Sequence, residues 1–67
     1  MIVPSKTLRK FIAEMFESQN EFARNYDVDP ATLTRYLKDE ISCSTGFMET
    51  VKTKTGMTFE TAFEVKE

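Results

Sequence analysis

Two cationic side chains, Arg35 and Lys38, stand three residues apart, which is the spacing of neighbours on one face of a helix. The same face would carry Pro30, Ala31 and Thr34. A guanidinium can donate to the O6 and N7 atoms of one guanine, and an ammonium can pair with a phosphate. These residue types predict contacts with double-stranded DNA in its major groove. Taken alone, however, two cations one turn apart are also typical of an ordinary solvated face.

Each residue on this face has a distinct expected role. We expect Arg35 to make the main base contact, because a bidentate bond to guanine discriminates between base pairs. Ala31 and Thr34 could touch a thymine methyl group or offer a hydroxyl. Thr32 lies at the edge of reach, and Pro30 shapes the approach to the bases without donating a hydrogen bond.

The chain lacks the groups that most catalytic sites use. It has no histidine, so a Ser-His-Asp arrangement and histidine-ligated metals are excluded, and it has no glycine-rich phosphate loop. Its one cysteine, Cys43, is expected to be a small buried side chain. We interpret Asp27 and Asp29 as turn and cap residues, and Asp39 and Glu40 as solvent-exposed acids. The sequence therefore predicts a protein that is not an enzyme and needs no cofactor.

Two helix starts would position the cationic face. Ser18 and Glu21 form the S-x-x-E pattern of a capping box, in which each side chain accepts from a main-chain N–H. Asp29-Pro30 is a second start signal, since aspartate caps a helix and proline suits its first position. The spacing predicts a short helix over about 19–25, a tight turn, and a second helix over about 30–39.

The apolar residues of this stretch fit two helices that cross steeply. They are Phe22, Ala23, Tyr26, Val28, Leu33, Tyr36 and Leu37. With Gln19 opening the first helix and the small Ala23 at the crossing, the pattern resembles the helix-turn-helix of the phage repressor and Cro family, the XRE-type regulators. The turn residue that is usually glycine is Asp27 here. That position needs a positive φ, which aspartate tolerates better than most residues.

The resemblance implies one DNA-binding domain over residues 1–67 with its helix-turn-helix at about 19–38. It implies phosphate contacts from Gln19 and its neighbour Asn20, and a phosphate contact from Lys38 at the other end. The implied function is a sequence-specific transcriptional regulator, a small phage-type repressor. Because a domain of this size reads only a few base pairs, we expect it to bind a palindromic operator as a homodimer. Its single cysteine favours a reducing, cytoplasmic setting. The expected dimer surface consists of Phe59, Phe63 and Val65.

A rival hypothesis is a helix-turn-helix fold that binds a protein, as an inhibitor or accessory factor of a phage or mobile element. The net charge of −2 and the glutamates near the C-terminus favour it, because nucleic-acid binders usually carry a basic balance. The first 38 residues hold most of the basic side chains, but they hold acids as well. Binding through phosphate contacts alone should therefore be modest.

The region before the two helices predicts an irregular arm over residues 1–4 and then an amphipathic helix capped by Ser5 or Thr7. Its apolar stripe comprises Leu8, Phe11, Ile12, Met15 and Phe16, at the spacing of one helix face. Its opposite, solvent-facing side comprises Arg9, Lys10, Glu14 and Glu17. We interpret the stripe as core packing.

Two folds remain open for the region after the cationic helix. Ser44 or Thr45 could cap a fourth helix that stops at Gly56, and Thr58 could cap a short fifth helix. Alternation of apolar and polar residues instead predicts a Cro-like β-hairpin that turns near Gly56. We favour the compact, all-α, five-helix repressor-like domain over three helices with a C-terminal hairpin.

Composition bounds the class of protein. With 40% hydrophobic and 30% charged residues, the 67-residue chain has an ordinary globular composition. Its longest apolar runs are far shorter than a membrane span or a signal-peptide core, so we expect neither, and we expect no membrane partner.

Overall fold

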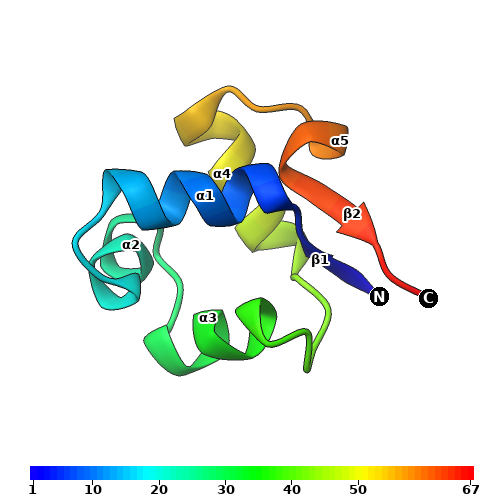
Figure 1. Ribbon diagram of the computed structural model, residues 1–67, viewed down its shortest axis with the longest axis horizontal. Coiled ribbons are helices and arrows are strands. Elements are labelled where there is room, and N and C mark those ends of the chain that lie inside the picture. The colour runs from blue at the N-terminus through cyan, green and yellow to red at the C-terminus, as the bar shows by residue number, and fades with distance from the viewer.

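Five helices pack together, and two short strands lie at the side of the molecule where both chain ends meet (Figure 1). The computed structural model describes all of residues 1–67. In chain order the elements are β1 (Ile2–Pro4), α1 (Lys6–Met15), α2 (Gln19–Asn25), α3 (Pro30–Leu37), α4 (Thr45–Thr55), α5 (Phe59–Ala62) and β2 (Phe63–Val65). The expectation of five helices is confirmed, but the fold is mostly helical rather than all-α.

The two strands form an antiparallel sheet that joins the beginning of the chain to its end. The register pairs Ile2 with Val65, Val3 with Glu64 and Pro4 with Phe63. The expectation of an irregular arm over residues 1–4 was therefore wrong. The alternative of a C-terminal hairpin was wrong as well, because α4 occupies the place of its first strand and β2 pairs with β1. Local sequence carried no signal for this pairing, since each strand depends on a partner at the far end of the chain.

Ser5 joins the sheet to α1. Its Oγ accepts from the N–H of Leu8 at 3.1 Å, which makes it the cap of α1. The same hydroxyl donates to the carbonyl of Thr61 at 2.6 Å, and the Ser5 N–H donates to the carbonyl of Ala62 at 2.8 Å. Ser5 is buried, and its carbonyl accepts from the N–H of Arg9 at 3.0 Å, so all its polar groups are satisfied. The cap residue thus also holds the start of α1 against the end of α5.

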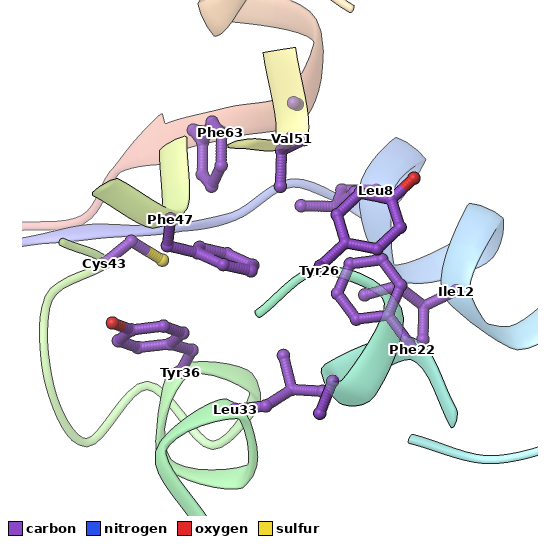
Figure 2. Packing of buried hydrophobic residues seen from close by; sticks show 12 residues of the cluster. Leu8, Ile12, Phe22, Tyr26, Leu33, Tyr36, Cys43, Phe47, Val51 and Phe63 are labelled. Carbon is purple, nitrogen blue, oxygen red and sulfur yellow. The ribbon is translucent and has the colours of Figure 1, made fainter. Parts of the chain in front are cut away.

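One hydrophobic core connects the helices and β2 (Figure 2). Its buried members are Leu8, Ile12, Phe22, Ala23, Tyr26, Leu33, Tyr36, Cys43, Phe47, Val51, Ala62 and Phe63. The ring of Phe22 stacks on that of Tyr26, with centroids 4.2 Å apart. The ring of Phe47 lies 4.9 Å from that of Tyr36 and 6.0 Å from that of Phe63. The ring of Phe47 also lies 6.3 Å from that of Phe22, so aromatic contacts run from α2 and α3 through α4 to the sheet.

The apolar stripe of α1 is confirmed except at its end. Leu8 and Ile12 are buried and Phe11 and Phe16 are half-buried, but Met15 is 65% exposed. The helix ends at Met15, and the chain then turns Phe16 inward, with its ring centroid 5.2 Å from that of Phe22. Phe16 takes the place at the core edge that the stripe assigned to Met15.

Candidate nucleic-acid interface

Helices α2 and α3 are joined by a four-residue turn over residues 26–29 and pack against each other. Asp27 in this turn has φ 55, so the predicted left-handed conformation is confirmed. The N–H of Val28 then donates to the carbonyl of Ala23 at 3.0 Å. Ala23 itself is fully buried, which allows the two helices to approach closely. The turn therefore sets the direction in which α3 leaves α2.

The predicted start of α2 is confirmed with one difference. Its bounds, Gln19–Asn25, agree with the spacing argument, and the Ser18 Oγ accepts from the N–H of Glu21 at 3.1 Å. The Glu21 carboxylate reaches back to the N–H of Glu17 at 3.4 Å rather than to that of Ser18. Only one of the two bonds of a capping box is therefore formed.

Helix α3 starts as predicted and ends earlier. The Asp29 carboxylate accepts from the N–H groups of Ala31 and Thr32, at 3.1 and 3.2 Å. The helix ends at Leu37 rather than at Asp39, because Asp39 has φ 60 and leaves the helical conformation. With Asp39 in the left-handed conformation, its N–H donates to the carbonyl of Tyr36 at 3.1 Å and the N–H of Glu40 donates to the carbonyl of Arg35 at 2.9 Å. This is the bonding pattern of a Schellman motif.

The outward face of α3 brings the predicted base-contact residues together. Pro30, Ala31 and Arg35 are exposed, and Thr32 and Thr34 are half-buried. The Arg35 side chain is 63% exposed. The Thr34 hydroxyl donates to the carbonyl of Pro30 at 3.0 Å, so its proton is used within the helix. Thr34 keeps its methyl group and its lone pairs for contacts with a ligand.

Of the two cations on this face, Arg35 has an acidic neighbour and Lys38 has none. The Arg35 Nε lies 3.8 Å from Oε1 of Glu40, and both side chains are more than half exposed. An ion pair of this kind contributes about 0–1 kcal/mol, so it leaves the guanidinium free to exchange partners. Lys38 is exposed and forms no ion pair. Two cations on this face are thus open to an anionic ligand.

A surface groove of about 480 Å³ runs between α1, the start of α2 and the outward side of α3. It is lined by Arg9, Ile12, Ala13, Phe16, Glu17, Ser18, Gln19, Thr34, Leu37 and Lys38. The predicted phosphate contacts Gln19 and Lys38 therefore border one groove, together with Thr34. Asn20 is exposed next to Gln19 but does not line the groove.

Arg9 and Asp39 were misplaced by the sequence interpretation. Arg9 was expected on the solvent-facing side of its helix, yet its guanidinium donates to the carbonyls of Pro4 and Leu37, at 3.0 and 2.6 Å, and to Asp39 at 2.8 Å. Asp39 was expected to be a solvent-exposed acid, yet it also accepts from Lys66 at 2.8 Å. The hydrogen bond from Lys66, with that from Arg9, holds the pKa of the Asp39 carboxyl below its usual range.

One signal for this cluster was present in the sequence. An acid directly after a helix C-terminus is disfavoured by the helix dipole, so it indicates a nearby cation. Arg9 supplies that cation and also binds the last carbonyl of α3. These contacts hold the end of α3 against α1 and β1.

The predicted dimer surface is only partly at the surface. Phe59 is 42% exposed and Val65 is 66% exposed. Phe63 is 3% exposed, packed against Phe47 and lying opposite Pro4 in the sheet. Including Phe63 in a dimer surface was therefore wrong, because its ring belongs to the core of the single chain.

Cys43 lies in the core, as expected. Burial raises the pKa of its thiol to about 12. No group of three histidine, cysteine, aspartate or glutamate side chains is arranged to hold a metal ion. None of the helices combines the length and the apolar character that crossing a membrane requires.

Comparison with protein-family models, with curated protein sequences and with solved structures finds no match for the chain.

Proposed function

We propose that the chain is a sequence-specific regulator of transcription that binds double-stranded DNA, with α2 and α3 as its helix-turn-helix. The observation that carries this proposal is the exposed Arg35 guanidinium on the outward face of α3. An α-helix fits the major groove of B-DNA, and residues on its outward face then reach base edges. Asp29 and Pro30 open α3 at the end that would enter the groove first.

In this proposal Arg35 donates to O6 and N7 of a guanine, after exchanging its weak pairing with Glu40 for the base. The Thr34 methyl group and Ala31 contact a thymine methyl, because the Thr34 hydroxyl proton is bonded within the helix. Thr32 lies at the margin of this contact. Pro30 sets the distance between the start of α3 and the groove.

Phosphate contacts would fix the orientation of α3. Gln19 at the start of α2 and Lys38 after the end of α3 border the same surface groove. A DNA strand that passes this groove would meet Gln19 on one side and Lys38 on the other, with Asn20 beyond Gln19. Such contacts position a protein on the duplex without reading its sequence.

A domain of this size reads too few base pairs to be specific on its own, which supports binding of two copies to a palindromic operator. Occupying the operator would block polymerase, and the chain would act as a repressor in the cytoplasm, in the manner of small phage regulators. It needs no cofactor and catalyses no reaction in this role.

A second candidate is a protein-binding inhibitor or accessory factor of a phage or mobile element. Its support is the net charge of −2, together with the Glu40 carboxylate beside Arg35. The same outward face would then dock on a protein instead of DNA.

Selection of bound duplexes from a random pool separates the two candidates. We expect enrichment of one half-site in inverted repeats, with binding that weakens as salt rises. A pool that stays random after selection, with no salt-dependent binding, would exclude the regulator and leave the protein-binding role.

A further inference from the structure

The two edges of the sheet differ in how their main-chain groups are satisfied. Along the outer edge of β1, the N–H of Ile2 donates to the Ser42 Oγ and its carbonyl accepts from Cys43, both at 2.9 Å. Pro4 has no N–H, and its carbonyl accepts from Arg9 at 3.0 Å. Every hydrogen-bonding group of the β1 edge therefore has a partner.

The outer edge of β2 is open by comparison. The N–H of Ser5 donates to the carbonyl of Ala62, and the N–H of Lys66 donates to the carbonyl of Met1. Ala62 and Lys66 are therefore positions of the antiparallel ladder at which the main chain bonds toward the N-terminal strand. By the alternation of such a ladder, the main-chain groups of Phe63 and Val65 point away from β1. The Phe63 N–H donates to Phe59. The Phe63 carbonyl and both main-chain groups of Val65 are left without a partner in the chain.

We propose that this edge pairs with the same edge of a second copy, so that β1 and β2 of both copies form one four-stranded antiparallel sheet. This inference rests on the part of the proposed function that calls for a homodimer, and it identifies the surface. An open strand edge is a template for pairing with another strand, and proteins usually cover or block such edges. Here β1 is covered and β2 is not.

One register satisfies the free groups. If Val65 lies opposite Val65 of the second copy, the two residues exchange N–H and carbonyl bonds. The free Phe63 carbonyl then accepts from the N–H of Glu67 of the second copy, while the Phe63 N–H keeps its bond to Phe59. The two exposed valines meet on the side of the sheet that faces the core. This arrangement buries the most exposed apolar side chain of the edge.

Charge favours the same register. It places Glu64 directly opposite Lys66 of the second copy, an opposite-charge pair at the short cross-strand distance. The Lys66 ammonium binds Asp39 of its own chain at 2.8 Å and has two further N–H donors for this pair. A register centred on Glu64 would put two glutamates opposite each other and would need the Phe63 N–H, which is already bonded. A register centred on Lys66 would face two lysines. Both alternatives place like charges across the strand pair, which is unfavourable.

Sedimentation equilibrium of the full chain without DNA tests the pairing. The Val65 N–H points to the free edge, so Val65→Pro removes a bond between copies and none within the chain. We expect wild type to show a monomer–dimer equilibrium and Val65→Pro to weaken it by about tenfold or more. Val65→Thr, which keeps the N–H and the β-branched shape, is the matched control and should remain dimeric.

A charge reversal provides a second test that does not depend on proline. Glu64→Lys should weaken the dimer by placing a lysine opposite Lys66 of the second copy, and Glu64→Gln, which removes the charge without creating a like-charge pair, should weaken it less. Lys66 is kept unchanged because it holds Asp39 within its own chain. Circular dichroism verifies that each variant is folded. A strictly monomeric wild type would overturn the pairing, and so would dimers of Val65→Pro or Glu64→Lys that are as tight as those of wild type.

The outcome is separable from that of the proposed function, because mass is measured without DNA. A dimer with the expected variant behaviour but no DNA binding would leave this inference standing and remove the regulator. A wild type that stays monomeric in solution yet selects a half-site would remove this inference and leave the regulator standing.

Discussion

Arg9 and Asp39, thirty residues apart in the chain, form an ion pair with an Nη2–Oδ1 distance of 2.8 Å. Asp39 stands just beyond the C-terminus of α3, where the partial negative charge of the helix disfavours an acid. Arg9 offsets both charges, because its guanidinium also binds the last carbonyl of α3. Lys66 binds the second Asp39 oxygen and links this cluster to the residue after β2.

We expect Asp39→Asn to destabilise the chain at neutral pH and to lose this effect in acid. The folded-state pKa of Asp39 lies below its usual value of about 3.9. Its contribution to stability is therefore fully present above the unfolded-state pKa and is lost as pH falls through the folded-state pKa. Urea unfolding of both proteins at a series of pH values measures the difference.

Asp27→Asn is the matched control for that experiment. Asp27 also has a positive φ, but it forms no ion pair and no side-chain hydrogen bond. This variant measures the effect of replacing a carboxylate by an amide at a positive φ where there is no ion pair to lose. If the Asp39→Asn difference is independent of pH, the ion pairs with Arg9 and Lys66 do not stabilise the fold.

Asp27→Gly should stabilise the chain by about 0.5 kcal/mol, since glycine adopts a positive φ without steric cost. Asp27 is exposed and its side chain makes no hydrogen bond, so little is lost. Asp27→Val should destabilise the chain by about 1 kcal/mol or more, because a β-branched residue is strained at a positive φ. Thermal unfolding measures both, and a destabilising glycine would contradict the role assigned to the turn.

Arg35→Ala should weaken binding to a selected duplex by about 1–3 kcal/mol and relax the preference at one base pair. The guanidinium makes no strong contact within the chain, so stability should hardly change. Lys52→Ala is the control, because Lys52 is an exposed, unpaired cation on α4. Titration of labelled duplexes tests this, and equal losses in both variants would indicate that only net charge matters.

Glu40→Gln should strengthen binding to the selected duplex, by up to about fivefold, if the ion pair with Arg35 competes with the base. Its carboxylate lies 3.8 Å from the Arg35 Nε. The gain should disappear in an Arg35→Ala background, which a double-mutant cycle measures. A gain of the same size in that background would assign the effect to general charge repulsion.

Cys43 should react with iodoacetamide far more slowly in the folded chain than in urea. Burial raises the pKa of its thiol from 9.0 to about 12, which lowers the thiolate fraction roughly a thousandfold. The thiolate is the nucleophile, and the side chain is also shielded by the core. Mass spectrometry follows the rate, and equally fast reaction with and without urea would contradict the burial.

Local signals explain why α2, the turn and α3 could be predicted closely. Ser18, Asp29 and Pro30 act within one helical turn of themselves, and Asp27 takes the conformation that its place in the turn requires. The apolar positions between the two helices also follow from spacing alone. These features need no knowledge of the rest of the chain.

Features that join distant residues could not be predicted in the same way. The pairing of β1 with β2, the burial of Phe63 and the ion pair of Arg9 with Asp39 each depend on a partner far along the chain. A three-residue strand has no periodicity to detect, and Phe63 has the same alternating context as the exposed Val65. The candidate site was therefore clearer from sequence than the sheet beside it.

The closure of the sheet has a consequence for synthesis on the ribosome. Residues 2–4 can pair only after residues 63–65 have left the exit tunnel, and Ser5 obtains its second set of bonds from residues 61 and 62 at the same moment. Helices α1 to α4 would already have emerged, and β1 would still lack its partner strand. Native closure of the nascent chain should accordingly be a late, abrupt event.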